Sequence, residues 1–136
     1  MNRFFKRFLG ESIPADEAGE AQRGFSPLES ETDWTRALEH SRREPVIIYK
    51  HSTSCGISAG ARRRLLELGL AGDPPVYEVV IQQARPLSHS IAATLGVRHE
   101  SPQAIVLHEG QAVFHTSHGS ITPDRLRTAV NEIRNA

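Results

Sequence analysis

The fold is decided by the stretch Val46–Ser58, VIIYKHSTSCGIS, in which an apolar run of strand length ends at a polar turn. This turn holds Cys55, the only cysteine among the 136 residues. A helix-like pattern follows, with apolar side chains at three- and four-residue steps: Ile57, Ala61, Leu65 and Leu68. We therefore expect Cys55 to lie at the junction between a buried strand and a helix over residues 58–68.

The position of Cys55 favours an ionised sulfur. A helix start presents unpaired backbone N–H groups and the positive end of the peptide dipoles, which favour a thiolate over a thiol. Helix N-termini and nearby cations lower a cysteine pKa from ~8.5 to roughly 3.5–7.5, and Lys50, His51 and the Arg62–Arg64 run could add positive potential. The alternative is a small core residue, since free cysteine is often buried. The polar neighbours favour a nucleophile: Ser52, Thr53, Ser54 and Gly56.

Composition narrows the classes of partner. Sixteen basic side chains balance sixteen acidic ones, so no global field favours nucleic acid or an anionic membrane. The length fits one compact domain with enough apolar residues for a core. A single cysteine cannot form an internal disulfide, so we expect a reducing cytoplasm. We expect no nucleic-acid partner and no stable membrane insertion.

The N-terminal residues differ in composition from the rest. Met1–Gly10, MNRFFKRFLG, could form a short amphipathic helix, but it lacks the apolar run and cleavage site of a secretory signal. Residues 10–30 are rich in Gly, Pro, Ser and charge, which is typical of a linker. We predict a flexible or loosely docked extension over residues 1–27 and a folded domain over residues 28–136.

The domain alternates between helical and strand-like patterns. Ser30 or Thr32 could cap the first helix, Gly96 closes the third, and Thr122 caps the last. Gly110 marks a hairpin turn. In order, we predict a helix at 28–43, a strand at 46–49, a helix at 58–68, a strand at 76–81, a helix at 86–95, strands at 104–107 and 112–115, and a helix at 122–134. The order α-β-α-β-α-β-β-α predicts a thioredoxin-like α/β fold, in which helices flank a central mixed four-stranded sheet in three layers.

Three motifs in this order resemble one family. They are TSCGIS at Thr53–Ser58, GVRHESPQ at Gly96–Gln103 and HTSHGSIT at His115–Thr122. Together they resemble the YtxJ family of monothiol bacilliredoxins, thioredoxin-fold proteins tied to the thiol bacillithiol, over roughly residues 30–134. The chain departs from the family pattern at Gly56, where proline is more usual, and at Gly119, where an aromatic residue is expected.

The resemblance implies a mechanism and a set of contacts. A cis Ser101–Pro102 bond would face Cys55, and the backbone of Ser101 would pair with an incoming substrate strand. Without the family pattern, a trans proline would be the ordinary expectation. Ser58 stands where a dithiol oxidoreductase has its second sulfur, so exchange of one small thiol remains. The implied partners are bacillithiolated client proteins and bacillithiol as co-substrate, with no bound cofactor.

Other polar residues have two possible roles each. Ser58 could donate a hydrogen bond to the thiolate or cap the helix, and Thr53 could cap the loop or touch the substrate. His51 and His99 could tune charge or bind a substrate carboxylate, and the cations could contact an anionic thiol or be solvated. None of the seven histidines has metal-ligand spacing with Cys55, so we expect no metal. The candidate residues beside Cys55 are Lys50, His51, Thr53, Ser54, Gly56, Ser58, Arg98, His99, Ser101 and Pro102.

Two alternative functions remain open. Cys55–Ser58, CGIS, resembles the CGFS motif of monothiol glutaredoxins, which hold a bridging iron–sulfur cluster as carriers. The chain lacks the Thr-Val-Pro loop and the following Gly-Gly pair that glutaredoxins use for glutathione. The second alternative is a non-catalytic thioredoxin-fold adaptor, which an unreactive Cys55 would favour.

Overall fold

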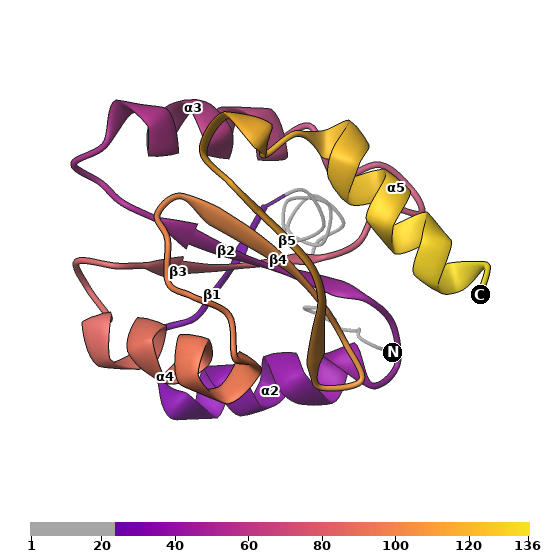
Figure 1. The fold of residues 1–136 in the computed structure, drawn as a ribbon, viewed down its shortest axis with the longest axis horizontal. Helices are drawn as coiled ribbons and strands as arrows, with labels where there is room; N and C mark the ends of the chain where they lie inside the picture. The colour runs from indigo at the N-terminus through magenta and orange to yellow at the C-terminus, as the bar shows by residue number, and fades with distance from the viewer. Residues whose placement is uncertain (1–23) are drawn as a thin grey trace, which may run out of the picture.

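A central sheet lies between two pairs of helices in the computed structural model, which describes residues 24–136 (Figure 1). In chain order the elements are β1 (Ser26–Pro27), α2 (Glu31–Ser41), β2 (Val46–His51), α3 (Gly56–Leu65), β3 (Val76–Val80), α4 (Arg85–Leu95), β4 (Gln103–His108), β5 (Gln111–Ser117), the 3-10 helix η1 (His118–Ser120) and α5 (Pro123–Arg134). The amphipathic segment predicted at Met1–Gly10 lies outside the described residues. No helix within residues 24–136 combines the length and apolarity that a membrane crossing requires.

The sheet has the strand order β1-β3-β2-β4-β5. Strands β1 and β2 run parallel to β3, whereas β4 is antiparallel to both β2 and β5. The predicted three-layer α/β class with a mixed sheet is confirmed, but the predicted count of four strands is wrong. The fifth strand, β1, pairs only Ser26 and Pro27 with Tyr77 and Glu78, so it is too short to leave a periodic sequence pattern.

Strand β1 adjoins the predicted domain boundary at residue 28. Phe25, just before the strand, packs against the ring of Tyr49 at 6.3 Å between centroids. The Arg62 guanidinium lies 4.9 Å from the Phe25 ring centroid and forms an ion pair of 2.6 Å with Glu78. The sheet therefore begins two residues before the predicted start of the domain, while most of the predicted extension over residues 1–27 lies outside the described residues and stays a prediction.

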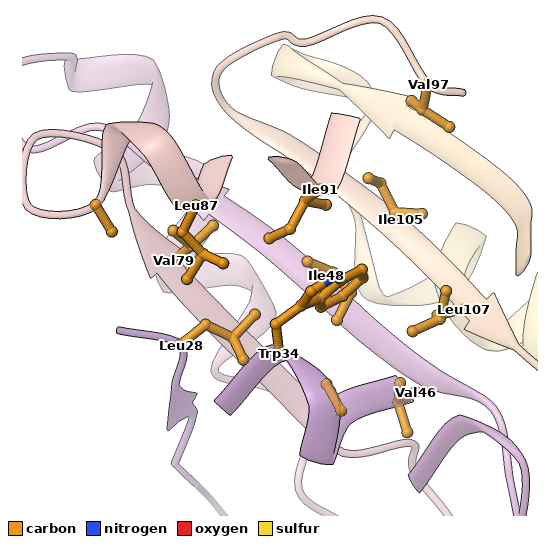
Figure 2. Packing of buried hydrophobic residues seen from close by; sticks show 12 residues of the cluster. Leu28, Trp34, Val46, Ile48, Val79, Leu87, Ile91, Val97, Ile105 and Leu107 are labelled. Carbon is orange, nitrogen blue, oxygen red and sulfur yellow. The ribbon is translucent and has the colours of Figure 1, made fainter. Parts of the chain in front are cut away.

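Each face of the sheet carries its own apolar core. Helices α2 and α4 cover one face, where Trp34 and Ile91 pack with Ile48 and Ile105 (Figure 2). Helices α3 and α5 cover the other face with a second cluster of buried side chains: Ile47, Tyr49, Ala61, Leu65, Ala104, Val106, Leu126 and Val130. Alternation along β2 thus directs odd-numbered residues toward α3 and even-numbered residues toward α4.

Three predicted capping residues and the predicted hairpin turn are confirmed. The Ser30 hydroxyl accepts a hydrogen bond from the Asp33 N–H at 3.2 Å, and the Thr122 hydroxyl accepts one from the Arg125 N–H at 3.3 Å. Gly96 ends α4 in the left-handed conformation at φ 67°. The hairpin turn between β4 and β5 has positive φ at both Glu109 and Gly110.

The first turn of α3 differs from the prediction. The helix begins at Gly56, directly after Cys55, and ends at Leu65 rather than at Leu68. Ile57 was predicted on the inner face but is 55% exposed, whereas Ala61 and Leu65 are buried. Ile57 follows the spacing of Ala61 and Leu65, but it lies in the first turn of α3, where its side chain is exposed.

Candidate active site

Three loops meet at one edge of the sheet, on the left in Figure 1. Parallel strands β2 and β3 both end there, and His51 pairs with Val80. Strand β4 starts there because it runs antiparallel to β2, with Gln103 opposite Lys50. The loop that holds Cys55, the loop before α4 and the loop before β4 therefore lie at the same edge.

Cys55 is the N-cap residue of α3 and is partly exposed. The backbone N–H of Ser58 is the main cause that lowers the pKa of Cys55, and the N–H of Ile57 and the side chain of Ser58 lower it further. Partial desolvation of the sulfur opposes this shift. The stabilisation of a thiolate therefore comes from the helix start, as expected, and the expected contribution of nearby cations is not among its causes.

Ser58 is buried inside the first turn of α3 and connects three parts of the site. Its Oγ atom accepts a hydrogen bond from the Ser52 N–H at 3.3 Å, and its carbonyl accepts one from the Tyr49 hydroxyl at 2.8 Å. Cys55, not Ser58, occupies the N-cap position. Ser58 therefore does not occupy the capping position of α3, and its donation of a hydrogen bond to the thiolate stays a prediction.

Gln82 holds the loop that precedes Cys55. Its Oε1 atom accepts a hydrogen bond from the Thr53 N–H at 3.1 Å. Its Nε2 atom lies 2.9 Å from Ser52 Oγ and 3.2 Å from Ser54 Oγ. Thr53 and Ser54 are exposed, so Gln82 from the β3–α4 loop fixes a segment that has little packing of its own.

The loop before β4 contains the cis Ser101–Pro102 bond that the resemblance implies. The Pro102 carbonyl accepts a hydrogen bond from the His118 N–H at 3.1 Å, which joins this loop to η1. Helix η1 in turn contacts α3, and Arg64 of α3 donates to the Ile121 carbonyl at 2.9 Å. The cysteine helix and the proline loop are thus connected through η1.

Two buried polar atoms near the proline loop have no hydrogen-bond partner within the described part of the chain. They are Ser101 Oγ and Gln103 Oε1. The other side-chain atom of Gln103, Nε2, donates to the Arg98 carbonyl at 3.0 Å. Ser101 therefore has a buried hydroxyl next to Pro102, and Gln103 fixes the loop through the backbone of Arg98.

Lys50 is fully buried and lies on the α4 side of the sheet. Its Nζ atom is 3.3 Å from the Ser88 carbonyl oxygen and 3.2 Å from His99 Nδ1. Burial lowers the pKa of Lys50 from 10.5 to about 8. Lys50 thus contacts His99 from inside the protein. It is not a surface cation, and it lies on the side of the sheet away from α3.

The remaining candidate residues are more exposed. His51 accepts or donates a hydrogen bond with the Tyr49 hydroxyl at 3.2 Å, and burial lowers the pKa of its imidazole. Arg98 is exposed, and Gly56 has open space around the position of a Cβ atom. No group of three or more His, Cys, Asp or Glu side chains suited to a metal ion occurs within residues 24–136.

Sequence reasoning did not select Gln82, Ser88 or Gln103. Their contacts bridge distant parts of the chain, so no local pattern marks them. One signal was available for Gln82, which directly follows a predicted buried strand at the edge where the cysteine strand also ends.

Comparisons with known proteins agree with this geometry. The family model described as monothiol bacilliredoxin BrxC matches residues 26–126. A solved structure described as a candidate oxidoreductase with a thioredoxin fold is 34% identical, covers 76% of this chain and 91% of its own, and has a TM-score of 0.69. Thioredoxin from Trypanosoma brucei brucei is 12% identical, covers 85% of this chain and 95% of its own, and has a TM-score of 0.68. A mutant thioredoxin from Halobacterium salinarum is 15% identical, with coverages of 82% and 92% and a TM-score of 0.66. The thioredoxin-like fold is confirmed. The family model and the structure that is 34% identical support a thiol oxidoreductase role.

Proposed function

This chain belongs to the monothiol bacilliredoxin family, and from that premise we propose that it removes bacillithiol from client proteins through Cys55. The observation that carries the proposal is the place of the sulfur. The only cysteine of the chain caps α3, where backbone N–H groups lower its pKa, and a buried serine, Ser58, occupies the position of a resolving thiol.

The first step exchanges one disulfide for another. The Cys55 thiolate attacks the bacillithiol sulfur of a protein–bacillithiol disulfide, forming a disulfide between Cys55 and bacillithiol. The client sulfur leaves with the electron pair of the broken bond and takes a proton from water. The client cysteine is thereby reduced, and Cys55 carries the bacillithiol.

The second step needs an external thiol because Ser58 has no sulfur. A second bacillithiol thiolate attacks the bacillithiol sulfur on Cys55, releasing bacillithiol disulfide and the Cys55 thiolate. In this scheme the Ser58 N–H and hydroxyl stabilise the Cys55 sulfur both as attacking and as leaving thiolate. The backbone of Ser101, which precedes the cis Pro102, is the proposed contact for the client backbone.

Intact-mass analysis tests the proposal. The reduced protein is incubated separately with bacillithiol disulfide and with oxidised glutathione, and Cys55→Ala serves as the control. We expect one bacillithiol adduct, confined to Cys55 and formed faster than any glutathione adduct. No adduct from either disulfide would overturn the proposal and favour an adaptor, and a visible absorbance band after anaerobic purification would favour a cluster carrier.

A further inference from the structure

His99 contacts two buried polar residues, Lys50 and Ser88, at the sheet edge where Cys55 also lies. Lys50 is fully buried and Ser88 of α4 is nearly so. Lys50 Nζ lies 3.2 Å from His99 Nδ1, and Ser88 Oγ lies 3.4 Å from the same atom. The Ser88 carbonyl also accepts from Lys50, so the three residues form one connected group.

These contacts determine which nitrogen of His99 carries a proton. An ammonium group has three donors and no acceptor, so Nδ1 must accept the hydrogen bond from Lys50. The pKa of His99 is lowered by burial first, and then by Lys50, His89 and Arg85, so the neutral ring is favoured. A neutral imidazole that accepts at Nδ1 carries its proton at Nε2, which is then a donor for a ligand.

Two further basic side chains on α4 adjoin His99. The His89 ring lies 5.8 Å from the His99 ring, measured between centroids, and Arg85 is one helical turn before His89. Both side chains are exposed, and both are among the charges that lower the pKa of His99. They form the outer part of the group, and Lys50 forms its buried part.

One acidic side chain, Glu100, also acts on this group. Glu100 is the one acid among the causes that act on the pKa of His99. The side chain of Ser117 lowers the pKa of Glu100, and the Glu100 carboxylate lies 3.7 Å from His118 Nδ1. Because Glu100 is engaged on that side, an anionic ligand would be attracted to the Arg85–His89 side.

The basic group also lies at the same sheet edge as Cys55. Arg85 begins α4 three residues after Gln82, whose side chain binds the loop Ser52–Ser54. His99 precedes β4, whose first residue Gln103 pairs with Lys50 near the end of the cysteine strand. A small molecule joined to the Cys55 sulfur could therefore extend toward these side chains.

We infer that Arg85, His89 and His99 bind the carboxylate of the low-molecular-weight thiol while its sulfur exchanges at Cys55. The inference rests on the proposed function and adds the side chains that would hold the charged part of the thiol, so that the site selects thiols with a negative charge. Arg85 supplies a lasting charge, His99 supplies the Nε2 donor, and His89 supplies a second imidazole beside it.

Small disulfides of similar length and different charge provide the test. The probes are 3,3′-dithiodipropionate, which is anionic, bis(2-hydroxyethyl) disulfide, which is neutral, and cystamine, which is cationic. The rate of adduct formation at Cys55 is measured by acid quench and intact mass, at low and high salt. The variants are Arg85→Gln and His89→Gln, and the control is Arg42→Gln, which removes one exposed charge beyond the end of α2.

The inference is tested by the ratio of two rates of adduct formation, the rate with the anionic disulfide divided by the rate with the neutral disulfide. We expect each of Arg85→Gln and His89→Gln to lower this ratio roughly two- to fivefold at low salt, with a smaller effect at high salt. The control should keep the ratio of the unmodified protein. A ratio unchanged in both variants, or lowered equally by Arg42→Gln, would overturn the inference while exchange at Cys55 still supports the proposed function. If none of the disulfides reacts with Cys55, the proposed function itself fails.

Discussion

The Ser58 hydroxyl oxygen accepts a hydrogen bond from the Ser52 N–H at 3.3 Å, which closes the loop around Cys55. The same serine also lowers the pKa of the Cys55 sulfur through its N–H and its side chain. One buried residue therefore both shapes the loop before the nucleophile and stabilises the thiolate after it forms. A serine here replaces the second sulfur of a dithiol site with neutral hydrogen bonds.

The Ser58→Ala substitution should raise the pKa of Cys55. It removes the hydroxyl contribution but keeps the larger backbone contribution, so the pKa should stay below that of a free cysteine. The lost contact with Ser52 should lower the free energy of unfolding by about 1 kcal/mol. The pH dependence of iodoacetamide alkylation measures the first effect, and urea unfolding measures the second.

Ser90→Ala is the matched control, because Ser90 belongs to α4 on the other face of the sheet. It should leave the alkylation profile of Cys55 unchanged. An unchanged profile in Ser58→Ala as well would contradict the assigned role of the hydroxyl.

The Gln82→Ala substitution should slow exchange at Cys55 roughly two- to tenfold, since it removes hydrogen bonds to Ser52, Thr53 and Ser54. The free energy of unfolding should change little because the side chain is exposed. Adduct formation with a small disulfide gives the rate. Gln83→Ala is the control, as Gln83 is the adjacent exposed glutamine, and an equal loss of rate in both variants would refute the positioning role.

Lys50 should make stability rise with pH in the alkaline range. Its pKa is about 8 when folded and 10.5 ordinarily, so the unfolded chain binds more protons between these values. The free energy of unfolding therefore increases with pH across this window. Below the window the buried charge of Lys50 lowers the free energy of unfolding by an amount that does not change with pH. The total change approaches about 3 kcal/mol, since each pKa unit corresponds to ~1.4 kcal/mol.

Comparison with Lys50→Met isolates this contribution. Free energies of unfolding are measured by urea titration from about pH 7 to about pH 9.5, below the range where tyrosines of the unfolded chain ionise near pH 10. As the pH rises, the free energy of unfolding of the unmodified protein should increase relative to that of Lys50→Met. Parallel pH curves would show that Lys50 keeps its ordinary pKa in the fold.

Much of the fold could be predicted because its signals are local. Thr122 and Gly96 mark helix ends through side-chain capping and left-handed backbone geometry, which depend on a few adjacent residues. Strand β1 could not be predicted, since its two residues are ordered by pairing with β3 about fifty residues later. Ile57 was misplaced because spacing gives the helical face but not the residue at which the helix starts.

The candidate site divides in the same way. The position of Cys55 follows from a strand that ends in a polar turn, and the cis Ser101–Pro102 bond follows from the resemblance. The roles of Gln82 and Lys50 depend on contacts with residues 28 to 49 positions away, which no sequence periodicity encodes. Lys50 was expected as a cation that could contact a thiol or be solvated, but it is fully buried and contacts His99.

The transfer of bacillithiol from a client protein to Cys55 tests the central claim most directly. A client with a single bacillithiolated cysteine is mixed anaerobically with the reduced protein, and the intact masses of both are followed after acid quench. We predict that one bacillithiol appears on Cys55 for each client thiol that is freed, and that Cys55→Ala leaves the client modified. Release of client thiols by Cys55→Ala at the rate of the unmodified protein, or a client that keeps its bacillithiol with both proteins, would contradict the account.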